Sequence, residues 1–141
     1  MKYLIVEDDF AARRLLKRYL SSYGECDIAV DGNEAVEAFR EAVDDNEPYD
    51  LICLDIMMPN MDGREALKAI RQIEHEHGIN GLDGVKVIMT TALGDSKSVI
   101  GSFREGCEAY IVKPVEKTKL LEEMEKLGLI ESASHQVRGQ A

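Results

Sequence analysis

The chain has 141 residues, of which 45% are hydrophobic and 31% charged, so it can form one domain with a core but leaves no room for a second. Its formal net charge of −10 at pH 7 repels phosphate backbones and anionic lipid, which argues against direct binding of nucleic acid or membranes. The absence of a signal-peptide pattern and of any apolar run of bilayer length predicts a cytoplasmic protein without membrane insertion.

Short apolar runs alternate with amphipathic helical patterns along the chain. The apolar runs are too short and too uniformly apolar for surface helices, so they predict strands at 2–6, 26–30, 51–55, 85–90 and 109–113. The helical patterns lie at 10–20, 33–43, 63–77, 96–106 and 116–128. This order predicts one α/β domain over residues 1–128, a doubly wound five-stranded parallel sheet flanked by five helices. The polar segment 129–141 is expected to form a short, partly disordered tail.

Polar residues follow four of the predicted strands, at the sheet edge where doubly wound folds bind ligands. They are Glu7-Asp8-Asp9, Asp55, Thr90-Thr91 and Lys113-Pro114. Carboxylates gathered there would repel each other, by about 4 kcal/mol per pair at 4 Å and an effective dielectric of 20, so folding alone does not explain them. A divalent cation would relieve the repulsion, and oxygen ligands without nearby His or Cys favour Mg²⁺ over Zn²⁺.

The same edge has the groups that phosphoryl transfer needs. Lys113 supplies a fixed positive charge and Thr91 a hydroxyl, and both can hold phosphoryl oxygens. Asp55 can act as the acceptor, because positioning and charge neutralisation carry most of the catalysis in this reaction and a weak nucleophile suffices.

Four segments, "VEDD", "LDIMMPNMDG", "MTTA" and "YIVKP", together resemble the receiver domain of two-component response regulators, the CheY-like family. They correspond in order and spacing to the family's acidic pair, phosphoacceptor segment, hydroxyl residue and lysine, and the resemblance covers residues 1 to about 128. It implies a sheet of strand order 2-1-3-4-5 and a phosphoryl group accepted on Asp55 from a histidine kinase or histidine phosphotransfer protein.

The resemblance also implies a metal site. Asp9, Asp55 and the backbone carbonyl of Met57 would bind Mg²⁺, and Asp8 would act mainly through a metal-bound water. Considered alone, Asp8 and Asp9 could instead cap the helix that begins at Phe10. The presence of Asp55 and a lysine at the same edge favours the metal site.

Further roles follow from the resemblance in the same way. Thr91 and Lys113 would contact the phosphoryl oxygens, the Lys113–Pro114 peptide bond would be cis, and Tyr110 would move with Thr91 as a switch. Phosphorylation would then change the binding of a downstream protein through the region 91–120, at a face formed by 95–120. We expect a monomer or weak dimer that assists its own phosphorylation and dephosphorylation but is not otherwise an enzyme, with no attached DNA-binding or catalytic domain.

Two positions depart from the rapidly reset chemotaxis members of the family. Met57 and Leu93 lie two residues after the phosphoacceptor and two after the hydroxyl residue, where those members have polar side chains that help to place the attacking water. Apolar side chains cannot orient a water, so slow dephosphorylation is predicted. The alternative is that Met57 and Leu93 only pack against each other.

Other classes of protein fit the residues less well. A haloacid dehalogenase-type phosphatase has an acid-base aspartate two residues after its nucleophile, where this chain has Met57, and a flavodoxin-like carrier needs a hydroxyl- and glycine-rich phosphate loop where this chain has "EDDFAA". A receiver-like binding module without phosphorylation would not need all the site residues. The basic face of the first predicted helix, made of Arg13, Arg14, Lys17 and Arg18, fits either an ordinary surface or a docking site for the phosphodonor.

Overall fold

The computed structural model describes residues 1–58, 60–80, 83–92 and 96–131. Across these residues strands and helices alternate in the order β1 (Lys2–Val6), α1 (Phe10–Leu20), β2 (Glu25–Ala29), α2 (Gly32–Asp44), β3 (Leu51–Asp55), α3 (Gly63–Glu76), β4 (Lys86–Thr91), α4 (Ser96–Glu105), β5 (Ala109–Val112) and α5 (Lys117–Lys126). The strands are parallel and hydrogen-bonded in the order β2-β1-β3-β4-β5. The predicted fold class and strand order are confirmed.

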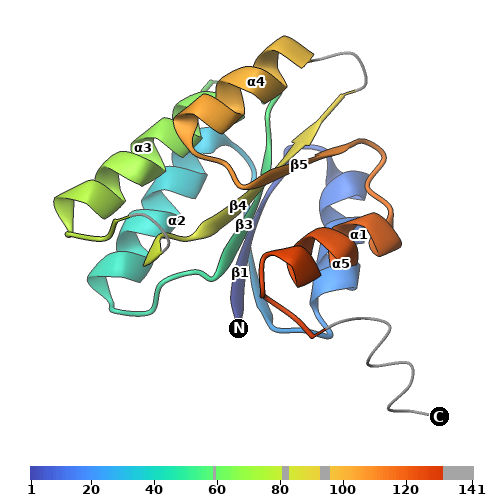
Figure 1. The fold of residues 1–141 in the computed structure, drawn as a ribbon, viewed down its shortest axis with the longest axis horizontal. Coiled ribbons are helices and arrows are strands. Elements are labelled where there is room, and N and C mark those ends of the chain that lie inside the picture. The colour runs from blue at the N-terminus through green and yellow to red at the C-terminus, as the bar shows by residue number, and fades with distance from the viewer. Residues whose placement is uncertain (59, 81–82, 93–95, 132–141) are drawn as a thin grey trace.

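The sheet is covered on both faces, by α1 and α5 on one side and by α2, α3 and α4 on the other (Figure 1). Alternate residues of each central strand enter opposite cores, because successive side chains of a strand point to opposite faces. In β1, Leu4 and Val6 pack towards α2 and α3, whereas Tyr3 and Ile5 pack towards α1 and α5. Two-sided burial explains why the central strands are apolar on both faces, apart from polar residues at their ends.

The edge strand β5 differs from the central strands. Its Ala109 and Ile111 are buried against α5, but Tyr110 and Val112 are 41% and 38% exposed on the α4 side. The sequence pattern of β5 resembles that of a buried strand, although half of its side chains reach the surface.

Element boundaries agree with the predicted ones to within one or two residues. The strands 2–6 and 51–55 and the helix 10–20 have the predicted bounds, whereas the second and fourth strands are each displaced by one residue. Pairing with β1 and β3 sets these ends, since β2 begins where Glu25 pairs with Lys2, and β4 where Lys86 pairs with Leu51. No helix among the described residues has the length and apolarity needed to cross a membrane.

The start of α3 lies directly against the end of β3. Asp62 and Glu65 form a capping box that begins the helix, and Gly63 N–H donates a hydrogen bond of 2.8 Å to the Ile56 carbonyl. A Cβ on Gly63 would lie only 2.2 Å from the backbone oxygen of Asp55, so only glycine permits this approach. The helix thereby fixes the backbone that carries Asp55.

Gly63→Ala should therefore lower the free energy of unfolding by about 1–3 kcal/mol, because two backbone segments must separate to admit the methyl group. Urea denaturation followed by circular dichroism measures the change. The matched control Lys68→Ala, at an exposed position of the same helix, should change the free energy by less than about 0.5 kcal/mol. A Gly63→Ala protein as stable as the wild type would contradict the contact.

Candidate functional site

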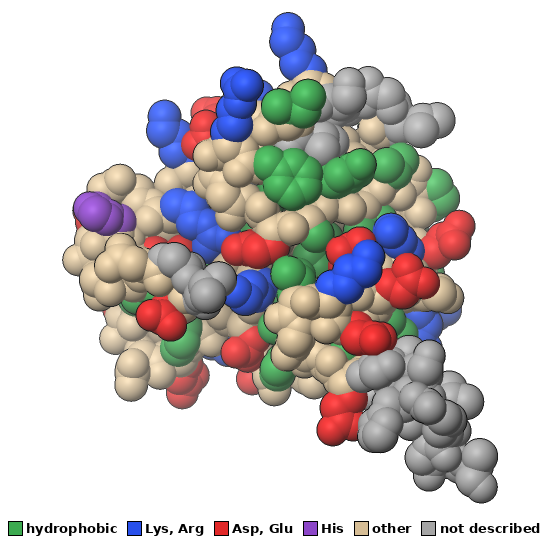
Figure 2. Space-filling model, viewed as in Figure 1, with side chains coloured by type: hydrophobic (Ala, Val, Ile, Leu, Met, Phe, Trp, Pro, Cys, Tyr) green, Lys and Arg blue, Asp and Glu red, His purple; other side chains and the backbone are tan. Residues whose placement is uncertain are grey.

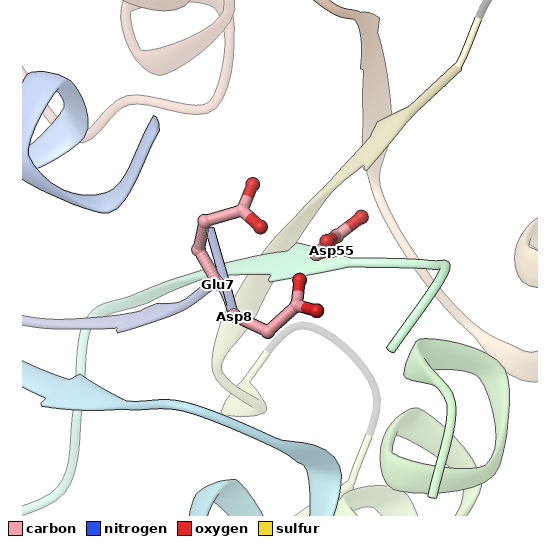
Figure 3. Close-up of side chains that lie close together, drawn as sticks. All are labelled: Glu7, Asp8 and Asp55. Atoms are coloured by element: carbon pink, nitrogen blue, oxygen red, sulfur yellow. The ribbon is translucent and has the colours of Figure 1, made fainter. Parts of the chain in front are cut away.

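Three carboxylates meet at the carboxyl edge of the sheet. Glu7 and Asp8 follow β1 and Asp55 ends β3, and one oxygen from each lies within 4.8 Å of the others (Figure 3). The pairing of Val6 with Leu54 explains this, because the next residue of each strand is then Glu7 or Asp55. Glu7 and Asp55 are buried, with 1% and 2% of their surface exposed, whereas Asp8 is open to solvent.

Lys113 joins this cluster from the far side of β4. Its Nζ lies 2.7 Å from Glu7 Oε1 and 3.1 Å from Asp55 Oδ2. The lysine is held by a hydrogen bond of 2.7 Å from its own backbone N–H to the Thr91 carbonyl, and the Lys113–Pro114 peptide bond is cis, as expected. Among the described residues, Lys113 is thus the cation that forms ion pairs with the carboxylates of this cluster, and it does not balance all three of them.

The protonation of the two buried carboxyl groups follows from this crowding. Burial, and then the Glu7 carboxylate, raise the pKa of Asp55 to about 7 against the opposing effect of Lys113. Burial also disfavours a charge on Glu7, but hydrogen bonds with Asp55 and Lys113 outweigh it and hold the pKa of Glu7 below its usual value. Of these two buried carboxyl groups, Asp55 is therefore the one whose protonated form the site favours, and a bound cation would oppose that protonation.

The cluster fits a hard divalent cation. All its ligand atoms are carboxylate oxygens, the kind that Mg²⁺ prefers, and the described part of the chain places no His or Cys in this group. The burial of two of the three carboxylates makes their repulsion expensive, and one lysine does not cancel it. An acidic triad of this composition is typical of a magnesium site.

Asp9 is not part of the cluster. Its Oδ2 accepts a hydrogen bond of 2.8 Å from the Ala12 N–H and so caps α1, which is the alternative that the sequence left open. Glu7 lies in the cluster instead, although Glu7 was not among the metal-site residues predicted from the sequence. A signal for Glu7 was available in the sequence, because a helix that begins at Phe10 places its cap at residue 9, and Glu7 and Asp8 then stand between the strand and the cap.

Thr91, Met57 and Leu93 were also predicted to belong to the site. Thr91 ends β4 and is buried, and its neighbour Thr90 accepts a hydrogen bond of 3.0 Å from Ile56 N–H, directly after Asp55. Met57 donates its backbone N–H to Asp55 Oδ1 at 3.3 Å, but its side chain is 65% exposed. Leu93 lies outside the described residues.

Tyr110 is not brought to the cluster. Its ring lies edge-on to Phe103 of α4, with the ring centroids 5.8 Å apart and the planes at 85°. Its side chain is partly open to solvent, so in this structure it occupies an outward position.

Comparison with known proteins agrees with this geometry. The pattern of the response regulator receiver domain matches residues 3–125. Chemotaxis protein CheY of Bacillus subtilis is 35% identical over 127 residues, which cover 89% of this chain and 95% of that protein. Other curated relatives are longer, and the chain spans only 42% of one and 12% of another.

Solved structures of the same fold include two complexes. The CheX-CheY-BeF3-Mg complex of Borrelia burgdorferi matches with a TM-score of 0.77 at 29% identity, over 91% of this chain and 89% of that one. The complex of the Saccharomyces cerevisiae phosphotransfer protein Ypd1 with the receiver domain of Ssk1 matches with a TM-score of 0.79 at 27% identity, over 91% and 88%. The chain belongs to the response regulator receiver domain family, whose CheY-like members are signalling switches rather than conventional enzymes.

Proposed function

We propose that this protein accepts a phosphoryl group on Asp55 from a histidine kinase or a histidine phosphotransfer protein, in a reaction that depends on Mg²⁺. The observation that carries the proposal is the cluster of Glu7, Asp8 and Asp55 with Lys113 bound to two of its members. The Ypd1–Ssk1 complex of yeast and the beryllofluoride and magnesium in the Borrelia complex support it, because both contain relatives of this chain.

The chemistry is a transfer between two nucleophiles. An Asp55 carboxylate oxygen forms a bond to phosphorus while the bond from phosphorus to the donor histidine nitrogen breaks, and that nitrogen keeps the electron pair. When bound by Asp8, Asp55 and the Met57 carbonyl, Mg²⁺ would neutralise charge on the phosphoryl oxygens. Glu7 would support this site from the buried side, beside Lys113.

Lys113 and Thr91 hold the transferred group. The Lys113 ammonium already contacts Asp55, so it can exchange that contact for a phosphoryl oxygen while Glu7 keeps it in place. The Thr91 hydroxyl at the end of β4 donates to a second oxygen. Both contacts form only with the phosphorylated protein, so they can favour a different arrangement of the elements that follow β4.

The output surface in this proposal is the 95–120 face, around α4 and β5. Hydrophobic side chains gather there (Figure 2), and those described as exposed include Ile100, Phe103, Tyr110 and Val112, which are 38–56% exposed. Exposed apolar clusters of this kind mark protein-binding surfaces. Inward movement of Tyr110 on phosphorylation would remove one side of the Phe103 contact and change the surface that a downstream protein meets.

The donor side of the proposal lies on α1. A groove of about 510 Å³ separates α1 from the segment after β5 and is lined by apolar side chains that include Ala11, Leu15 and Val115. Phe10 is 65% exposed at its end, and Arg14 and Arg18 lie along the same helix. A phosphodonor with an apolar helix and acidic flanks would fit this surface, next to Lys113. Such donors act in the cytoplasm, where we place the protein.

Phosphorylation should occur on Asp55 alone. With Mg²⁺ and acetyl phosphate, intact-mass spectrometry should show one added phosphoryl group in the wild type and none in Asp55→Asn. The matched control Asp45→Asn, which alters an exposed aspartate, should be labelled like the wild type. Labelling that persists in Asp55→Asn, or its failure in the wild type, would contradict the proposal.

Substitution of Asp8 should change the response to Mg²⁺, whereas substitution of Asp9 should change the stability. Asp8→Asn should abolish the rise in Tm caused by Mg²⁺, which at ten times the Kd amounts to about 1.4 kcal/mol, or roughly 3–6 °C. Asp9→Ala should lower the stability by about 1 kcal/mol through loss of the cap but keep the full Mg²⁺ shift. Thermal unfolding with and without Mg²⁺ measures both, and an Asp9→Ala protein that no longer responds to Mg²⁺ would restore Asp9 as a ligand.

The phosphorylated state should be long-lived because Met57 cannot guide water to the phosphoryl group. Met57→Asn should speed hydrolysis by about 5- to 150-fold, which corresponds to roughly 1–3 kcal/mol for one positioning hydrogen bond. Loss of the phosphoryl group can be followed by mass spectrometry in excess Mg²⁺, first with this variant and then with Leu93→Glu added. Met57→Leu is the control and should match the wild type. Equal rates in all variants would show that these side chains do not set the lifetime.

A further inference from the structure

Two arginines of α3 meet two glycines in and after α4. Arg64 and Arg71 are seven residues apart, about two helical turns, so they lie on one face of α3. A Cβ on Gly101, in the middle of α4, would lie 2.2 Å from Arg64 Cζ, and a Cβ on Gly106, just after α4, would lie 3.2 Å from Arg71 Nε. These contacts join α3 to α4, which lie side by side (Figure 1).

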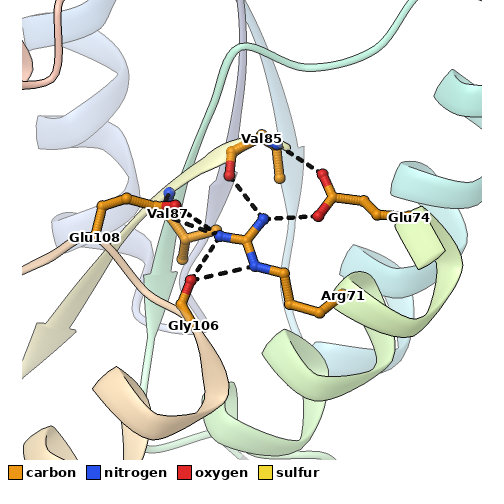
Figure 4. A network of polar contacts seen from close by, with 6 residues as sticks. All are labelled: Arg71, Glu74, Val85, Val87, Gly106 and Glu108. Atoms are coloured by element: carbon orange, nitrogen blue, oxygen red, sulfur yellow. Dashed lines mark hydrogen bonds and ion pairs between the residues drawn. The ribbon is translucent and has the colours of Figure 1, made fainter. Parts of the chain in front are cut away.

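The contact of Arg71 is held by many hydrogen bonds (Figure 4). Its Nη2 and Nε donate to the Gly106 carbonyl at 2.7 and 3.2 Å, and its Nη1 donates to the Val85 carbonyl at 2.8 Å. The guanidinium also forms ion pairs with Glu74 and Glu108. Glu74 accepts a hydrogen bond from the N–H of Val85, just before β4, and Glu108 accepts one from the N–H of Val87 in β4, both at 2.6 Å. The carboxyl end of α4 is thus fixed to α3 and to the sheet.

The contact of Arg64 is different. Its guanidinium lies where the side chain of residue 101 would be, and its Nε is buried without a hydrogen-bond partner among the residues described. Nothing therefore compensates for the water that this N–H has lost. Gly101 also weakens α4, since glycine is a poor helix former, but any larger residue would collide with Arg64.

Arg64 also lies next to the phosphoacceptor segment. It follows Gly63, which contacts the backbone of Asp55 and donates its N–H to Ile56. Arg64 therefore has one neighbour in the site and the other in α4, and the middle of α4 is attached by fewer hydrogen bonds among the described residues than its carboxyl end.

We propose that α4 pivots about Gly106, where Arg71 holds it, and that Arg64 is a positioning residue whose contact with Gly101 opens when Asp55 is phosphorylated. Opening lets water reach the buried Nε–H of Arg64, so Arg64 favours the activated arrangement. This inference rests on the proposed function, because it describes how phosphorylation reaches the 95–120 face.

The test uses beryllofluoride, with Mg²⁺, as a stand-in for the phosphoryl group and measures its affinity by titration in the full chain. Arg64→Ala should bind it at least about five-fold more weakly. Gly101→Ala should bind it more tightly, since the added methyl group displaces Arg64, and should have no effect when Arg64→Ala is already present. Arg71→Lys, chosen because Arg71→Ala removes many bonds at once, should leave the affinity within about two-fold.

Hydrogen exchange measures the pivot directly. In the wild type, beryllofluoride should change exchange more in 97–103 than in 104–110, and Arg71→Lys should raise exchange in 104–110 equally with and without it. Independent effects of Arg64→Ala and Gly101→Ala on affinity, or a larger change in 104–110, would overturn the pivot. Failure of the wild type to bind beryllofluoride would instead refute the proposed function.

Discussion

Glu7, Asp8 and Asp55 place one carboxylate oxygen each within 4.8 Å of the others, and among the described residues Lys113 is the cation that forms ion pairs with them. Two of the three are buried, so solvent screens little of the repulsion. The fold can hold them there because β1 and β3 are both central strands with cores on either side. Burial, and then the unbalanced charge of Glu7, raise the pKa of Asp55. The fit to a divalent cation and the readiness of Lys113 to change partners follow from the same unbalanced charge.

Much of this site could be predicted from the sequence, because strand ends in a parallel sheet fall on one edge. Asp55 and Lys113 each terminate an apolar run, which placed them at one edge of the sheet, and in the structure they form an ion pair across the end of β4. The acidic pair is harder to assign from the sequence, because three consecutive acidic residues allow either Glu7 with Asp8 or Asp8 with Asp9. In this structure Asp9 caps α1, and Glu7 rather than Asp9 lies in the cluster with Asp8 and Asp55. The side-chain position of Tyr110 depends on how α4 packs, which strand patterns do not determine.

The contacts of α4 could not be predicted at all, because they depend on long side chains of a neighbouring helix. Gly101 is a poor helix former, yet it also gives Arg64 room. The carboxyl end of α4 shares the buried network of Arg71, whereas its middle rests on a guanidinium with an unpartnered N–H among the described residues. This asymmetry suits a helix that must move at one end while the sheet remains unchanged.

The central claim is that the cluster binds Mg²⁺ and then a phosphoryl group between Asp55, Thr91 and Lys113. Backbone amide chemical shifts, measured by NMR during titration with Mg²⁺ and then beryllofluoride, test it most directly. Mg²⁺ alone should shift resonances in 7–9 and 55–58, and beryllofluoride should then shift those of Thr91 and Lys113. Resonances of 7–9 and 55–58 that stay unchanged at saturating Mg²⁺ and beryllofluoride would contradict it.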